Sequence, residues 1–169
     1  MVKNLQNVIL DEVDKSLLRA LQKDGRLSNV QLARKISLSP PATHSRLKRL
    51  EKEGYIRNYT VIVDPEKAGY DLQCFIQIGL QTPQSIQVEG FREAMRKMPE
   101  VLDCYHITGE YDYILKVVLR NRKDLEHFIM NKISSIPGVA RIHTNLVLAE
   151  VKSTMALPLE YFLQRLFQN

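Results

Sequence analysis

Two short helices with marked ends, separated only by Ser37 and Leu38, constrain the fold of this chain more than any other feature. The first follows Ser28, and the second follows Ser39, opens with two prolines and ends at Gly54. Serine is a favoured N-cap, proline suits a first turn whose N–H groups have no partner, and glycine ends helices. Two capped helices joined by so short a turn predict a helix-turn-helix.

The second helix is amphipathic, with a basic side. In a helix-turn-helix its N-terminal residues meet the base edges in the major groove. We therefore expect base contacts from the cap and first turns, which comprise Ser39, Pro41, Thr43, His44, Ser45 and Arg46. Lys48, Arg49 and Lys52 lie further along and are expected to meet phosphate. The same charges would also suit an ordinary solvated surface helix, so the motif needs support from its context.

The charge of the chain supplies such context. Residues 1–64 hold 12 Lys and Arg against 7 Asp and Glu, whereas residues 65–169 hold 12 of each. The whole net charge of +5 therefore belongs to the part that carries the proposed reading helix. Affinity for a phosphate backbone comes largely from clustered Lys and Arg, so this asymmetry favours nucleic acid as a partner.

The flanks of the helix pair predict a small winged domain. A first helix starts at Asp11, carries leucines on one face and ends near Gly25, which supplies a third wall for the core. After Gly54 the pattern alternates over residues 55–57 and 59–63, which predicts a short strand pair, or wing. Arg57 would touch a flanking phosphate or remain a plain surface arginine. Residues 1–64 thus form a predicted winged helix-turn-helix domain.

A second architecture begins after residues 65–71, a short run with Pro and Gly that predicts a linker or hinge. Alternating strand patterns and helical stripes then follow one another in the order βαββαβ, the ferredoxin-like split unit. The predicted strands cover 72–80, 101–108, 113–119 and 139–151, and the helices cover 87–98 and 122–136. The fold class is therefore α+β, with a second domain over residues 72–156.

Two features predict association. Apolar residues at alternate positions of every strand imply that the sheet face without helices needs a partner, so we infer a dimer or higher oligomer. Residues 157–169 form an apolar extension, expected to be helical, in which Tyr161, Phe162, Leu163, Leu166 and Phe167 lie close together. This extension could pack on its own subunit or on a neighbour, and the sequence leaves both open.

Several runs resemble the Lrp/AsnC transcription regulators, also called feast/famine regulators. They occur in the family's order and spacing and span nearly the whole chain: Leu21-Gln22-Lys23-Asp24-Gly25-Arg26 with Ser28-Asn29, Leu38-Ser39-Pro40, Arg46-Leu47-Lys48-Arg49-Leu50-Glu51, Gly54-Tyr55-Ile56, Gly109-Glu110-Tyr111-Asp112-Tyr113, Ile136-Pro137-Gly138-Val139 and Glu150-Val151-Lys152-Ser153-Thr154.

The resemblance implies an N-terminal winged domain that binds double-stranded DNA and a C-terminal RAM domain that dimerises by sheet-to-sheet packing. Such dimers often assemble into octamers or other rings, and small effectors, usually amino acids, bind in clefts between subunits. The chain departs from shorter members in its apolar tail after Pro158, which bears on the assembly state.

The glycine-acid run 109–112 is the candidate effector loop. By itself it suits a hairpin turn. An α-amino acid needs negative charge for its ammonium and exposed N–H groups for its carboxylate, which Glu110, Asp112 and the backbone at Gly109 would supply. By resemblance, the effector cleft is lined by this loop and by Ile136, Pro137, Gly138 and Val139. Tyr111, Tyr113 and Thr144 are candidate wall residues, and His106 is a weaker one.

Other functions have little support in the residues. Cys104 and His106 share a strand face, but no second pair at a usual zinc spacing accompanies them, so no metal is expected. The chain shows no phosphate loop or catalytic constellation, and neither an enzyme nor a cofactor is expected. No apolar run approaches membrane-spanning length, and the two cysteines suit a reducing cytoplasm.

The leading hypothesis is a sequence-specific transcription regulator whose DNA binding or assembly responds to a small effector. An architectural, chromatin-like protein that coats DNA without an effector would use the same basic domain and oligomer. It would show steep salt dependence and little sequence preference. A metabolite-binding module or small enzyme whose helix-turn-helix is only a protein interface would show no DNA affinity at low salt.

Overall fold

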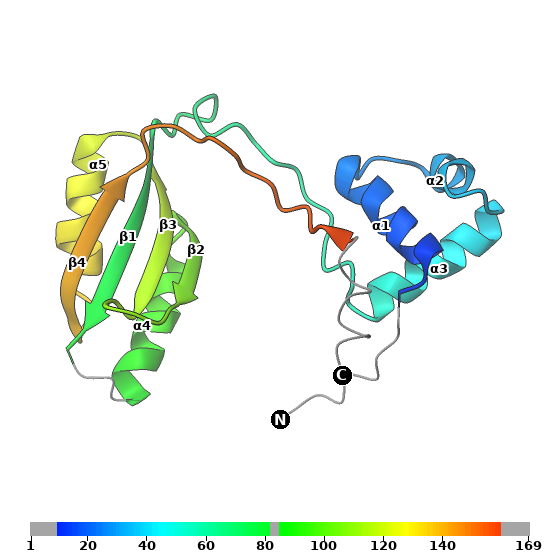
Figure 1. Cartoon of the computed structure of the whole chain (residues 1–169). Helices are drawn as coiled ribbons and strands as arrows, with labels where there is room; N and C mark the ends of the chain where they lie inside the picture. The colour runs from blue at the N-terminus through cyan, green and yellow to red at the C-terminus, as the bar shows by residue number, and fades with distance from the viewer. Residues whose placement is uncertain (1–9, 82–84, 160–169) are drawn as a thin grey trace. The chain divides into compact units, whose positions relative to one another are not determined.

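The computed structural model describes residues 10–81 and 85–159 (Figure 1). The chain forms two compact units, one comprising residues 10–61 with 153–159 and the other residues 62–152. Within the described residues, no helix is both long enough and apolar enough to cross a bilayer.

The first unit contains three helices, α1 (Glu12–Lys23), α2 (Asn29–Lys35) and α3 (Pro40–Lys52). Each begins at the predicted cap, because the side chains of Asp11, Ser28 and Ser39 accept hydrogen bonds from backbone N–H groups in the first turns. The three helices enclose a core of leucines made of Leu10, Leu17, Leu18, Leu32 and Leu50. The helix-turn-helix is confirmed.

The strand pair predicted over residues 55–57 and 59–63 is wrong in this structure. The backbone N–H groups of Tyr55 and Ile56 donate to the carbonyl of Leu50, so this segment closes the end of α3 instead of starting a strand. Residues 57–64 contain no strand, and Val61 and Ile62 are each 82% exposed. A strand requires a neighbouring strand for its hydrogen bonds, and the described part of the first unit offers none.

The second unit is a four-stranded antiparallel sheet in the order β2-β3-β1-β4, which confirms the ferredoxin-like prediction. Its elements are β1 (Leu72–Leu80), α4 (Ser85–Lys97), β2 (Val101–His106), β3 (Tyr113–Leu119), α5 (Arg122–His127), η1 (Phe128–Ile133) and β4 (Val139–Leu146). The long helix predicted over 122–136 changes to π-helical turns at Phe128, and β4 stops at Leu146, short of the predicted strand end.

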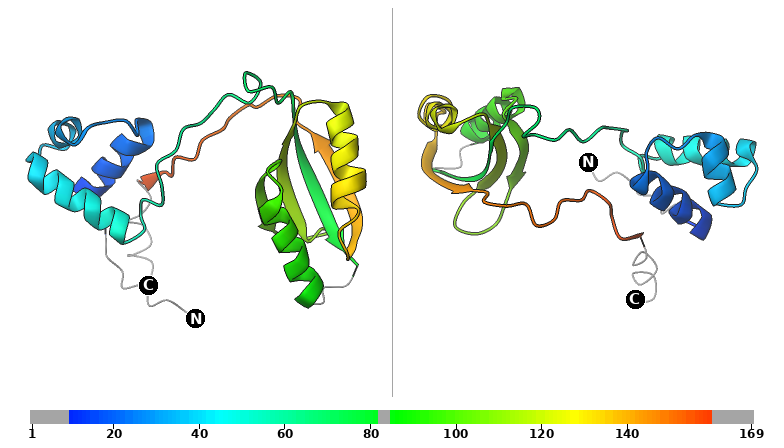
Figure 2. Two further views of the ribbon diagram at one scale, coloured as in Figure 1. Left: turned by 180° about the vertical axis from the view of Figure 1, so that it is seen from behind. Right: turned by 90° about the horizontal axis from the view of Figure 1, so that it is seen from above.

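Both helical segments cover one face of this sheet (Figure 2). Alternate residues of the central strands point to that face and form the core with Phe91, Met95 and Phe128. The opposite face carries Phe75 and Tyr105, which are 37% and 58% exposed. The period of two in β1 and β3 therefore divides their side chains between a packed face and an open face.

The C-terminal segment returns to the first unit. The side-chain amide of Gln22 on α1 donates to the carbonyl of Leu157 at 3.2 Å and accepts from its N–H at 2.6 Å. Leu159 packs against the leucine core of the same unit. Most of the predicted helix over 157–169, with the aromatic residues at 161, 162 and 167, lies outside the described residues.

Truncating the centre of the sheet core tests this packing. Leu115 is fully buried in β3, so Leu115→Ala should lower the free energy of unfolding by about 2–5 kcal/mol. Leu148, at 97% exposure, provides the matched control, and Leu148→Ala should change the stability by less than about 0.5 kcal/mol. Urea unfolding followed by circular dichroism measures both. Equal effects of the two substitutions would contradict the assigned core.

Candidate nucleic-acid interface and ligand loop

The outer side of α3 carries most of the residues predicted to contact DNA. Pro41, His44, Ser45, Lys48 and Lys52 are all exposed, and Ser39 caps the helix. His44 and Ser45 can hydrogen-bond to base edges near the N-terminus of the helix, Pro41 can make apolar contacts there, and the two lysines can reach phosphates further along. Arg57 is also exposed, beyond the end of the helix.

Thr43 is not part of this outer side, which corrects its prediction as a base contact. Its side chain is fully buried, and its hydroxyl donates to the carbonyl of Ser39 at 3.0 Å. The helical spacing indicates that Thr43 is buried, because it lies four and seven residues before Leu47 and Leu50, which face the core.

Arg46 and Arg49 turn towards α1 and bind a buried carboxylate. Nη1 of Arg46 lies 2.9 Å from Oδ1 of Asp14, and Nη2 of Arg49 lies 2.5 Å from Oδ2 of the same residue. Arg46 also contacts Asp11 at 2.5 Å. The Asp14 side chain is only 1% exposed, so the two arginines of α3 compensate a charge that water does not reach.

The electrostatics of this cluster follow from its geometry. Burial raises the pKa of Asp11, but the N–H of Asp14 and the guanidinium of Arg46 outweigh it and hold that pKa below its usual value. Hydrogen bonds to Asp11 and Asp14 raise the pKa of Arg46, and the bond to Asp14 raises that of Arg49. The role of Asp14 was not predicted, because its position in the first turn of α1 indicates only helix capping.

The turn between α2 and α3 is tied to both helices. The side-chain amide of Asn29 donates to the carbonyl of Pro40 at 2.8 Å, which joins the first turns of α2 and α3. Ser37 adopts a φ of 56°, a left-handed conformation that a non-glycine residue rarely takes. The start of α3 is thus positioned by the turn, by Asn29 and by the arginine pairs.

The loop between β2 and β3, residues 109–112, is hydrogen-bonded to the end of β1. The carboxylate of Asp112 accepts from the N–H of Leu80 at 2.7 Å, and the N–H of Asp112 donates to the carbonyl of Ile78 at 2.9 Å. Gly109 has a φ of 123°, which favours glycine. The Asp112 carboxylate therefore already has a structural partner, whereas Glu110 is 72% exposed.

Arg141 on β4 joins this loop and was not predicted. Its Nη2 donates to the carbonyl of Glu110 at 2.6 Å, and its Nη1 lies 3.4 Å from Oε1 of the same residue. Its guanidinium carbon lies 5.0 Å from the centroid of the Tyr111 ring. A Cβ at Gly79 would lie 3.0 Å from Nε of Arg141, so glycine leaves room for this side chain. Glu110 and Arg141 present opposite charges side by side.

The turn made of Ile136, Pro137, Gly138 and Val139 approaches the same end of β1 from the β4 side. The carbonyl of Gly138 accepts from the N–H of Gln81 at 2.8 Å, and Val139 pairs with Leu80 in the sheet. The loop 109–112 and this turn therefore flank the end of β1 from its two neighbouring strands.

Two candidate wall residues have other neighbours in this structure, so their role as walls of the cleft stays a prediction. Thr144 pairs with Ile76, nearer the middle of the sheet. Tyr113 is 3% exposed and turns beneath α4, where its hydroxyl accepts from Nε of Arg92 at 3.2 Å. His106 stacks on the Tyr113 ring at 4.9 Å. The alternation of side chains along β3 indicates that Tyr113 is buried, since it shares its face with the core residues Leu115 and Val117.

Two family models match the chain. Residues 10–57 match a winged helix-turn-helix DNA-binding domain, and residues 73–157 match the Lrp/AsnC ligand binding domain. These segments contain α3 and the loop 109–112, respectively.

The chain is similar to transcriptional regulators over almost the whole length of each one. The transcriptional regulator AzlB of Bacillus subtilis is 35% identical over 153 residues, which cover 90% of this chain and 98% of the relative. The leucine-responsive regulatory protein of Escherichia coli is 34% identical, covering 88% and 90%. The structure of a Neisseria meningitidis transcriptional regulator in complex with L-Met matches with a TM-score of 0.88 and 37% identity, covering 92% of this chain and all of that one.

Removing the buried carboxylate tests the cluster beneath α3. Asp14→Asn should destabilise the first unit by about 2 kcal/mol, because the charge-assisted hydrogen bonds to Arg46 and Arg49 are lost. Solvent screening limits the loss, because the two arginine side chains are about one-third exposed. Hydrogen exchange of α1 and α3 amides should rise accordingly. Glu126→Gln, the same change on exposed α5, should leave that exchange unaltered. Unchanged protection in Asp14→Asn would show that the cluster does not stabilise α3.

Proposed function

This chain belongs to the Lrp/AsnC family of transcriptional regulators, and we propose that it contacts DNA through the outer side of α3 and responds to an amino acid bound at the loop 109–112. The N-terminal helix-turn-helix makes it a DNA-binding protein, and the second unit is its ligand-binding domain. We assign DNA binding to residues 1–64, a hinge to 65–71, and effector binding and oligomerisation to 72–156.

The main support for the proposed DNA contacts is that the outer side of α3 is exposed. Pro41, His44 and Ser45 lie in the first turns, where base contacts occur. Lys48 and Lys52 lie further along the helix, where phosphate contacts are expected. Arg46 and Arg49 act mainly through Asp14, by orienting α3. Arg57 provides a further phosphate contact. The net positive charge of residues 1–64 supports this assignment.

The pair formed by Glu110 and Arg141 supports an amino-acid effector. An α-amino acid carries an ammonium and a carboxylate, which match the carboxylate of Glu110 and the guanidinium of Arg141. Tyr111 and the turn 136–139 would contact its side chain. The solved regulator from Neisseria meningitidis was captured with L-Met, which supports the same class of ligand here.

The exposure of this pair supports an oligomer. Glu110 and Arg141 are 72% and 55% exposed, so enclosing an effector there requires a second subunit. The open face of the sheet, with Phe75 and Tyr105, offers the surface for a homodimer. Such dimers would assemble further, as octamers, to bring loops of neighbouring dimers together.

Lys48 tests the DNA interface. Lys48→Ala should weaken binding to specific and unrelated DNA alike and reduce the slope of log K against log salt by about 1, because one phosphate contact is lost. Fluorescence anisotropy with labelled promoter DNA over a range of salt concentrations measures this. Lys97→Ala, an exposed lysine of α4, should change neither quantity. An unaltered slope for Lys48→Ala would exclude it from the interface. A wild-type protein with no preference for its own promoter would favour the architectural alternative.

Ligand-induced stabilisation tests the effector. Thermal unfolding with each of the twenty amino acids at millimolar concentration should show a selective rise of the melting temperature, on the order of 5 °C at 100 times Kd. Arg141→Met should abolish the rise, because the partner of the effector carboxylate is lost. Arg120→Met, which breaks an exposed ion pair with Asp124 elsewhere in the unit, should retain it. Absence of any shift would remove the amino-acid effector.

A further inference from the structure

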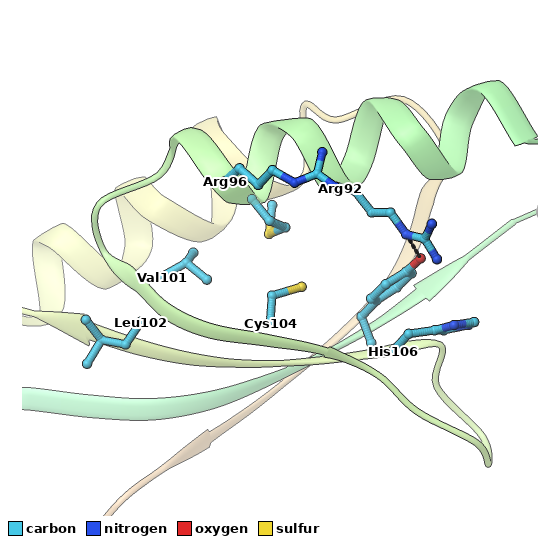
Figure 3. Close-up of a pocket in the computed structure, with 8 residues that line it drawn as sticks. Arg92, Arg96, Val101, Leu102, Cys104 and His106 are labelled. Atoms are coloured by element: carbon cyan, nitrogen blue, oxygen red, sulfur yellow. Dashed lines mark hydrogen bonds between the residues drawn. The ribbon is translucent and has the colours of Figure 1, made fainter. Parts of the chain in front are cut away.

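A cavity of about 430 Å³ lies between α4 and the edge strand β2 (Figure 3). Its volume falls within the range of small-molecule sites. Two arginines, one histidine, one thiol and four apolar or aromatic side chains line it, namely Arg92, Met95, Arg96, Val101, Leu102, Cys104, His106 and Tyr113.

One end of the cavity is polar and positively charged. Nε of Arg92 donates to the hydroxyl of Tyr113 at 3.2 Å, and the buried Tyr113 ring lies between Phe91 at 4.6 Å and His106 at 4.9 Å. The nearest oxygen of Glu89 is 3.8 Å from Nη1 of Arg92, beyond hydrogen-bond distance. The packed tyrosine thus orients Arg92, while guanidinium N–H groups stay available for an anion.

Arg96 contributes differently from Arg92. Its Nη1 is bound by Glu89 at 3.0 Å and by Glu93 at 3.1 Å. Its charge is therefore balanced on the surface of α4, and its role in the cavity is mainly that of an aliphatic stem. Arg92 is the anchor for an anionic group.

The other end of the cavity is apolar. Figure 3 shows Val101 and Leu102 at the end opposite to Arg92 and His106, with the thiol of Cys104 between the two ends. Met95, which is 4% exposed, closes the wall on the α4 side. A ligand that fills this cavity therefore needs an anionic head and an aliphatic body.

None of the eight described residues that line the cavity carries a carboxylate. An amino acid bound with its carboxylate on Arg92 would bring its ammonium against a described lining that offers no carboxylate, because Glu89 lies outside that lining and is bound to Arg96; this is unfavourable. We propose that this cavity binds a small aliphatic carboxylate that lacks an ammonium group, a short branched fatty acid or a 2-oxo acid. This would be a second ligand site of opposite preference to the amino-acid site at Glu110 and Arg141.

Cys104 provides a direct readout, because it is exposed and lies within the cavity. Cys74 is the internal control, since it is fully buried and burial raises its pKa to about 11. We would measure alkylation of both thiols by iodoacetamide, a neutral reagent, using mass spectrometry of the intact full-length protein. A bound ligand should slow Cys104 about tenfold at ten times its Kd, by mass action.

Four probes at equal millimolar concentration separate the possibilities. 4-Methylpentanoate or 4-methyl-2-oxopentanoate should protect Cys104, and the one that protects more strongly identifies the source of the carboxylate. Leucine, which adds an ammonium, and 4-methylpentanamide, which lacks the charge, should not protect it. Equal protection by leucine or by the amide would overturn the proposal, as would absence of protection by either carboxylate. This comparison uses the wild-type protein and needs no DNA or effector response.

Two variants then locate the anion. Arg92→Met should remove the protection by the carboxylates, whereas Lys97→Met, which removes a charge from α4 outside the cavity lining, should retain it. Burial raises the pKa of Cys104 and Arg92 opposes this, so Arg92→Met changes the basal rate as well. The ratio of rates with and without ligand, taken within each variant, is therefore compared. Full protection in Arg92→Met would overturn the proposal.

Discussion

The carboxylate of Asp14 forms the contacts on which the proposed DNA-facing surface of α3 depends. It lies inside the first unit with both oxygens occupied, one by Arg46 and the other by Arg49. A buried charge is tolerated only when it is paired with good geometry, so α3 must take the angle to α1 that brings both arginines to it. The exposed residues of α3 are presented at that angle.

The second unit depends on a sheet that is covered on one side only. Its core is formed by alternate residues of β1 and β3 beneath α4 and α5, and the remaining side chains are left on the open face. The proposed ligand-binding groups therefore lie where packing ends. The loop 109–112 and the turn 136–139 meet at the end of β1, and the cavity beside Cys104 opens between α4 and the edge strand.

Much of the fold could be predicted from the sequence because its signals are local. The N-caps of α1, α2 and α3 act within three residues, and the bounds of β1 and β3 follow from alternation along single strands. The prediction of a strand pair after Gly54 was wrong for the opposite reason. Alternation over residues 59–63 shows a capacity to form a strand, but a strand exists only where another backbone pairs with it.

The candidate sites were predicted by segment, and individual side chains were misplaced. Thr43 lies in the predicted reading helix but faces the core of the first unit, and Tyr113 follows the loop directly but turns beneath α4. In both cases the periodicity of the element decides the direction of the side chain, which a motif defined by position alone overlooks. Arg141 had no signal in the sequence, since its link to Glu110 arises from the pairing of β4 with β1.

The sequence by itself determined where the helices begin, the order of the elements and the charge of the DNA-binding part, because caps, periodicity and composition act over short stretches of chain. Only the tertiary structure decided which charges meet. Asp14 and Arg49 are 35 residues apart, and Glu110 and Arg141 are 31 apart. Such pairs form when packing brings distant elements together, and the energy of a charge depends on the burial and partners that it finds there.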